Sequence, residues 1–183
     1  MRLAIVTGFT LFRVFAAAII VMLWPHQAWT AIFLLMVIGF TTDLFDGLLA
    51  RRWHVVSRFG KIADPLADKV ICLTVLWLVA SYYNSWLLLL GTGVITIYDI
   101  STMALRFTTT RAAQPVAGAS LIAKIKTIVL MASLSLLLLS ILAGGGLLFG
   151  SGLTLLIIAC ALSVWSLRQY VGQVVSAKRE PEL

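Results

Sequence analysis

The sequence predicts an all-α integral membrane protein with six transmembrane helices in one bundle, and three observations support this fold class. First, 61% of the 183 residues are hydrophobic and only 11% are charged, whereas a soluble domain carries about 25% charged residues. Second, six apolar segments reach the roughly 20 residues that a membrane-spanning helix needs. Third, the basic residues gather at alternate connections between these segments. A water-soluble globule is excluded, because too little polar surface is available to cover it.

Local turn chemistry separates the six segments in order. Residues 24–27, with a proline, divide the first pair, polar residues 81–85 divide the third from the fourth, and three consecutive glycines at 144–146 divide the last pair. Loops at 51–61 and 108–118 complete the connections. All are short, so we expect one domain over the whole chain, residues 1–183. The predicted spans cover residues 4–24, 28–50, 62–82, 85–107, 121–143 and 147–170.

The amino end superficially resembles a secretory signal peptide. Its apolar run is long, however, and no convincing small-residue cleavage site follows it. We therefore expect a retained first helix.

The placement of positive charge predicts the topology. All 14 Lys and Arg residues lie near the two ends of the chain or near the second-to-third and fourth-to-fifth connections, and the other connections contain none. Cytoplasmic loops carry such an excess, so we expect a multi-pass protein of the inner (plasma) membrane with both termini in the cytoplasm. The net charge of +7 does not indicate nucleic acid, because the basic residues lie between apolar spans. Cys72 and Cys160 fall in apolar runs and predict packing, without a disulfide framework.

Five of the seven acidic residues lie within spans or at their ends. An Asp at the centre of a membrane helix costs about 2.5–3.5 kcal/mol on insertion scales. Four of the five fall on predicted faces of two consecutive, antiparallel helices, so they can meet at one cytoplasmic depth. The two faces consist of Asp43, Asp46, Gly47 and Ala50 on one helix and of Gly60, Asp64 and Asp68 on the next.

Four converging carboxylates would repel one another unless cations intervene. An all-oxygen ligand set selects Mg²⁺ or Mn²⁺ over Zn²⁺, and two such ions would offset four charges and leave room for a pyrophosphate. The small residues Gly47, Ala50 and Gly60 would let a nucleotide approach the backbone, and Arg51 can bridge phosphate oxygens. The alternative is a structural charge cluster with the neighbouring Arg and Lys residues.

This acidic segment resembles the CDP-alcohol phosphotransferase family, a family of six-helix membrane enzymes. The family pattern is D-x-x-D-G-x-x-A-R, eight residues, then G-x-x-x-D-x-x-x-D, and residues 43–68 match it at every fixed position. The resemblance implies that Asp43, Asp46 and Asp64 ligate the metals and that Asp68 completes the metal site and acts as the general base. It further implies a homodimer. The implied contacts to the CDP-linked donor are Gly47, Ala50, Arg51, Ser57, Gly60, Thr10 and Arg13.

Within the family, the chain is most similar to the enzymes that join glycerol 3-phosphate to CDP-diacylglycerol. The similarity includes the runs 10–13, 64–69, 124–127 and 165–170. A phosphorylated acceptor also needs a basic pocket, although the positive-inside bias explains any single cation equally well. Lys124 and Lys126 are two residues apart on a helix and point in different directions, so we expect only one of them to contact the acceptor. The candidates for the pocket are Lys124, Lys126, Arg106, Arg111 and Arg168.

One departure concerns the fourth predicted span. These enzymes usually carry Ala-Arg-Glu there, where this chain has Ile97-Tyr98-Asp99, which also resembles the family's cardiolipin synthases with phosphatidylglycerol as acceptor. Asp99 is predicted to orient the acceptor, to support helix packing, or to form a buried hydrogen bond with a Ser, Thr or Tyr. A non-enzymatic transporter or scaffold is a remote alternative, because no repeat or midplane charge pattern is visible.

Overall fold

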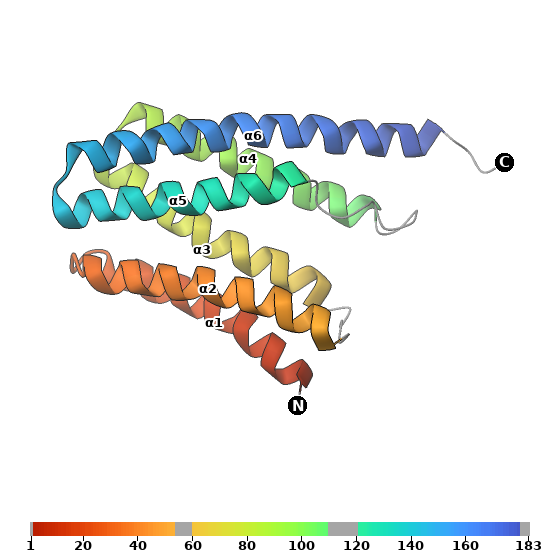
Figure 1. Ribbon diagram of the computed structural model, residues 1–183, viewed down its shortest axis with the longest axis horizontal. Helices are drawn as coiled ribbons and strands as arrows, with labels where there is room; N and C mark the ends of the chain where they lie inside the picture. The colour runs from red at the N-terminus through yellow and green to blue at the C-terminus, as the bar shows by residue number, and fades with distance from the viewer. Residues whose placement is uncertain (1, 54–59, 110–120, 180–183) are drawn as a thin grey trace.

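The described part of the chain is entirely helical where it has regular secondary structure (Figure 1). The six helices are α1 (Arg2–Leu23), α2 (Trp29–Trp53), α3 (Gly60–Tyr83), α4 (Trp86–Thr109), α5 (Leu121–Ala143) and α6 (Gly146–Arg179). The prediction of an all-α protein is therefore confirmed, and the described residues form six helices, whereas the prediction that all six cross a membrane stays a prediction. The computed structural model describes residues 2–53, 60–109 and 121–179, with side chains at 11–42, 67, 69–105, 122–169 and 171–172.

Three helices are long and apolar enough, within these described residues, to cross a membrane. They are Trp86–Leu105, Ile122–Ala143 and Gly146–Gln169. The described parts of the first three helices contain shorter apolar stretches, Leu11–Leu23, Trp29–Thr42 and Lys69–Tyr83. The structure thus supports a membrane-embedded helical protein with three candidate spans.

Several helices extend past the predicted spans. The last one was expected to end at residue 170 and runs to Arg179, and the second was expected to end at residue 50 and runs to Trp53. The end of an apolar stretch predicts where a helix leaves the membrane. The helix itself can continue past that residue, because polar residues can also form its backbone hydrogen bonds. The prediction of span ends was therefore not a prediction of helix ends.

The three connections that lack basic residues are tight turns at one end of the bundle, which we call the turn end. Gln27 and Asn84 have positive φ values of 54° and 46°, and Gly144 has a φ of 68°. The Gly144 N–H donates to the Ser140 carbonyl at 3.0 Å, which closes the carboxyl end of α5 in the left-handed conformation that glycine favours. The expected turn at 24–27 is confirmed, and breaks also occur within 81–85 and 144–146, where they are shorter than predicted because α3 ends at Tyr83 and α6 begins at Gly146.

α3 occupies the middle of the bundle, where it contacts α1, α2, α4 and α5, while α6 packs on α5 and α4. The buried residues of α3 recur at helical spacing, with Ile71, Val75, Leu76 and Val79 all almost inaccessible to solvent. The core continues through Ile20 of α1, Ile32 and Met36 of α2, Leu88 and Ile95 of α4, Leu134 and Leu137 of α5 and Leu156 of α6.

Large apolar side chains also cover the outside of the bundle. Met22 is 72% exposed and Ile97 is 66% exposed, and many Leu and Ile residues resemble them. Ser and Thr hydroxyls on the helices donate to carbonyls three or four residues earlier, as Thr96 does to Thr92 and Ser151 does to Leu147. An apolar exterior with internally satisfied hydroxyls is what a lipid environment requires.

Aromatic rings gather at the turn end. Trp24 and Trp29 lie edge to face with centroids 5.0 Å apart, and Tyr82 packs on both. Tyr83 contacts the Phe149 ring and shares a hydrogen bond with the Ser140 hydroxyl, which links α3 to α5. Trp and Tyr are enriched where a membrane meets water, so this cluster indicates a boundary of the bilayer.

The opposite end of the bundle, which we call the polar end, brings together the helix ends that carry most of the predicted site residues. The amino terminus, the end of α2, the start of α3, the end of α4, the start of α5 and the carboxyl end of α6 all lie there (Figure 1). Antiparallel neighbours with short turns at the turn end place these segments together. The polar end is therefore where a functional site is to be sought.

Candidate functional site

The four predicted metal ligands lie on two neighbouring helices at the polar end. Asp43 and Asp46 belong to the second half of α2, and Asp64 and Asp68 belong to the start of α3. The two helices contact each other, and these parts of them lie at the same end of the bundle (Figure 1). The four carboxylates themselves lie outside the described side chains, so the predicted metal centre stays a prediction. Among the described side chains, no three metal-ligating residues come together.

The predicted donor contacts follow the same two helices. Gly47, Ala50 and Arg51 belong to α2 and Gly60 is the first residue of α3, while Ser57 lies outside the described residues. Their predicted contacts to the donor stay predictions as well.

α1 contributes a buried cation to this half of the molecule. Arg13 is 1% exposed and is one of the largest fully buried side chains, and α1 packs against both α2 and α3. Thr10, one turn earlier in α1, has its side chain outside the described part. Burying a guanidinium in an apolar helix is costly, so Arg13 is a functional candidate on physical grounds.

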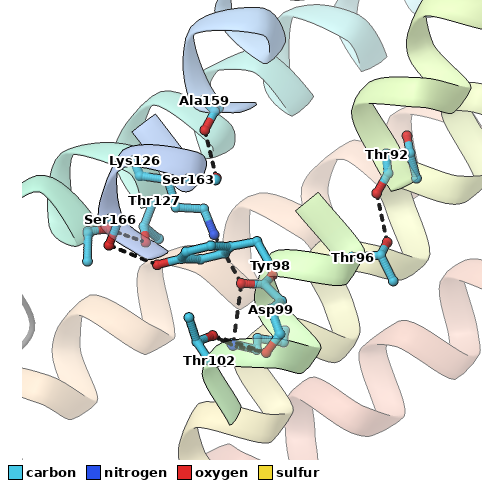
Figure 2. A network of polar contacts seen from close by, with 12 residues as sticks. Thr92, Thr96, Tyr98, Asp99, Thr102, Lys126, Thr127, Ala159, Ser163 and Ser166 are labelled. Atoms are coloured by element: carbon cyan, nitrogen blue, oxygen red, sulfur yellow. Dashed lines mark hydrogen bonds and ion pairs between the residues drawn. The ribbon is translucent and has the colours of Figure 1, made fainter. Parts of the chain in front are cut away.

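A largely buried polar cluster joins α3, α4 and α5, and Figure 2 shows its members on α4 and α5. The ammonium of Lys126 donates to Asp99 Oδ1 at 3.0 Å, and the ammonium of Lys69 lies 3.4 Å from the same oxygen. Lys69 also donates to the Asp99 carbonyl at 2.8 Å and to the Thr102 hydroxyl at 3.1 Å. One carboxylate therefore serves two cations from two other helices.

Tyr98, the neighbour of Asp99 in α4, also contacts Lys126. The Lys126 ammonium lies 4.2 Å from the centroid of the Tyr98 ring, over the face of the ring (Figure 2). The Tyr98 hydroxyl donates to Ser166 Oγ at 3.1 Å, which ties α4 to α6. A ring face attracts a cation most strongly where water is excluded, so Tyr98 helps to hold the Lys126 ammonium in place.

The other predicted acceptor contacts are spread over the polar end. Lys124 and Arg168 are exposed, whereas Lys126 is 5% exposed, so the two nearby lysines do point in different directions. Arg106 belongs to α4 with its side chain outside the described part, and Arg111 lies outside the described residues. The roles of all five in acceptor binding stay predictions.

Sequence reasoning missed two members of the polar cluster, Lys69 and Thr102. Lys69 directly follows Asp68 in α3, and a lysine at that depth in an apolar helix is a signal that needs a nearby anion. The partner of Asp99 had been left open, and the structure identifies two lysines in place of a Ser, Thr or Tyr. Thr102 carried no signal, since hydroxyls on membrane helices usually bond to their own helix.

Comparison with known proteins gives a consistent result over the whole chain. The sequence model described as CDP-alcohol phosphatidyltransferase matches residues 3–165. A protein of Pectobacterium atrosepticum named CDP-diacylglycerol--glycerol-3-phosphate 3-phosphatidyltransferase is 35% identical over 185 residues, covering 99% of this chain and 100% of its own. Relatives with the same name from Sodalis glossinidius and Salmonella choleraesuis are 35% and 34% identical, covering 93% and 94% of this chain and 94% and 95% of their own.

Proposed function

The chain belongs to the CDP-alcohol phosphatidyltransferase family, and from this premise we propose that it transfers the phosphatidyl group of CDP-diacylglycerol to glycerol 3-phosphate. The products are phosphatidylglycerophosphate and CMP. One observation carries the proposal: the complete acidic pattern lies on the adjoining helices α2 and α3, at the same end of the bundle as the half-buried Lys69 of α3 and the buried Lys126 of α5. The names of the full-length relatives support glycerol 3-phosphate as the acceptor.

The four proposed metal ligands fit hard divalent cations. Asp43, Asp46, Asp64 and Asp68 offer only carboxylate oxygens, which Mg²⁺ and Mn²⁺ prefer. Two such ions, when bound, would supply positive charge that offsets the charge developing on the pyrophosphate oxygens.

The reaction requires one proton transfer and one displacement at phosphorus. Asp68 accepts the proton of an acceptor hydroxyl. The freed oxygen forms a bond to the phosphorus on the lipid side of the pyrophosphate, and the bond from that phosphorus to the bridging oxygen breaks, so that CMP leaves with the electron pair. Gly47, Ala50 and Gly60 leave room for the nucleotide.

The remaining donor contacts are cations and hydroxyls. Arg51 and Ser57 would hold the CDP part of the donor, and Arg13 and Thr10 of α1 would contact its phosphates. A guanidinium binds phosphate in a fixed, two-pronged geometry, which suits both arginines.

For the acceptor, we favour Lys126 over Lys124. Lys126 is held in one place by Asp99 and Tyr98, whereas Lys124 is exposed and fits the ordinary excess of cytoplasmic positive charge. Arg106, Arg111 and Arg168 would add positive potential around the entrance.

The proposal includes a placement in the membrane. All six helices would cross the inner (plasma) membrane, with the polar end and both termini in the cytoplasm, because the connections at the turn end contain no Lys or Arg. Family resemblance alone supports a homodimer.

A product assay tests the proposal. Purified protein in lipid nanodiscs receives CDP-diacylglycerol, Mg²⁺ or Mn²⁺ and either glycerol 3-phosphate or phosphatidylglycerol, and mass spectrometry identifies the lipid product. We expect phosphatidylglycerophosphate and stoichiometric CMP with glycerol 3-phosphate. Cardiolipin formed from phosphatidylglycerol instead would move the protein to the other acceptor class, and no CMP with any alcohol would refute the enzymatic assignment.

A further inference from the structure

The polar cluster brings two ammonium groups to one carboxylate oxygen. Among the described side chains it contains the two ammonium groups of Lys69 and Lys126 and the single carboxylate of Asp99. The side chains of Asp99 and Lys126 are both 6% exposed, and that of Lys69 is 24% exposed. Asp99 and Lys126 therefore meet in a largely dry environment, where an electrostatic interaction is stronger than in water.

Lys126 retains hydrogen-bonding capacity in this arrangement. An ammonium has three donors, and within the described residues the one hydrogen bond of Lys126 goes to Asp99 Oδ1. The Tyr98 ring covers a further side of the ammonium. A cation that is fixed on two sides and has remaining donors is preorganised to receive an oxyanion.

Lys69 connects this arrangement to the helix that carries the predicted base. It directly follows Asp68 in α3 and reaches α4 at three atoms, the carboxylate and carbonyl of Asp99 and the hydroxyl of Thr102. Asp99 accepts from Lys126 of α5 at the same time. The Asp99 carboxylate is therefore the common point through which α3 and α5 are aligned.

We propose that Asp99 is a positioning residue for the acceptor: it holds the Lys126 ammonium in place and aims it at the acceptor phosphate, in register with Asp68 on α3. This inference rests on the proposed function. Asp99 itself touches neither substrate. Tyr98 supplies a ring face to the same ammonium, so the cation of α5 is held from two sides by α4.

The competing explanation is a structural one, in which the charges only hold three helices together. Replacing a buried ion pair by neutral groups of similar size is often harmless, whereas removing one partner is damaging. The double variant Asp99→Asn/Lys126→Met therefore separates the two explanations. It removes both charges of the closest pair, so a purely structural pair would be dispensable, whereas an acceptor-binding lysine would not.

The test compares Michaelis constants for the two substrates in nanodisc-embedded enzyme. For Asp99→Asn we expect the KM for glycerol 3-phosphate to rise by about tenfold or more and the KM for CDP-diacylglycerol to stay within about twofold. The double variant should keep the raised acceptor KM. Thr92→Val is the matched control, because Thr92 is buried in the same helix outside the polar cluster, and both constants should stay unchanged.

Asp99→Glu serves if Asp99→Asn does not fold, because it keeps the charge while displacing it by one methylene. Its acceptor KM should rise by about threefold or more, with the donor KM unchanged. Recovery of the wild-type acceptor KM in the double variant, or equal changes in both constants in Asp99→Asn or Asp99→Glu, would overturn the inference. The wild-type product reports separately on the proposed function: if another phosphate-bearing acceptor is used, the same ratios are measured with that acceptor.

Discussion

Replacing Gly152 by alanine should loosen the contact between α5 and α6. A Cβ at Gly152 would lie 2.8 Å from Leu137 Cγ and 3.2 Å from the Leu137 backbone nitrogen. The helices are already joined at this level, because the Ser133 hydroxyl donates to the Gly152 carbonyl at 2.7 Å. A side chain can rotate away from a new methyl group, but a backbone nitrogen moves only with its helix.

The expected magnitude follows from two opposing terms. Overpacking of a close contact costs about 1–3 kcal/mol, and replacing a helical glycine by alanine returns about 0.5–1 kcal/mol. The net loss in the free energy of unfolding is therefore about 0–2.5 kcal/mol, with a midpoint of about 1 kcal/mol. Gly150→Ala is the matched control on the same helix, since a Cβ there meets nothing within 4 Å and only the gain should remain.

The assay is an SDS titration of the purified protein followed by tryptophan fluorescence. The unfolding midpoint of Gly152→Ala should fall below that of the wild type, and the midpoint of Gly150→Ala should equal or exceed it. If both variants shift the midpoint equally, the close approach of α5 and α6 does not restrict the size of the side chain at position 152.

Three further predictions concern the acidic segment and the core. Asp68→Asn should abolish CMP release while leaving the unfolding midpoint close to the wild-type value, and near-normal turnover would remove Asp68 from the base role. Chelation of divalent ions should stop turnover, and Mg²⁺ or Mn²⁺ should restore it where Zn²⁺ does not; activity that persists in excess chelator would contradict the metal prediction. Thr92→Val should raise the free energy of unfolding by about 1 kcal/mol, because the buried Thr92 hydroxyl has no hydrogen-bond partner among the described residues, and a loss of stability would indicate an unseen partner.

The helices and their turns were predictable because their signals are local. Apolar runs of about 20 residues predict helices in a membrane, and the glycines at 144–146 and the polar residues at 24–27 and 81–85 predict breaks wherever they occur. The end of α6 at Arg179 was not predictable from apolarity, since the helix continues beyond its apolar part.

The partners of Asp99 depend on a different kind of information. Lys69 and Lys126 are 30 and 27 residues away from it, and their meeting depends on the rotation of three helices about their axes. Helical spacing within one segment carries no information on that rotation. The same spacing did predict that Lys124 and Lys126 point apart, because both residues belong to one helix.

The aromatic rings at the turn end provide a reference point from which depth in the membrane can be measured along α3. The 14 residues from Asp68 to Tyr82 span about 21 Å along a helix that rises 1.5 Å per residue, against roughly 30 Å of hydrocarbon. If the rings mark one boundary of the bilayer, Asp68 would lie several ångströms inside the other boundary, and Asp64 would lie about one turn nearer to it. Under the proposed function, the nucleotide headgroup of the donor would then enter below the membrane surface, and bilayer thickness would set how far each lipid has to sink.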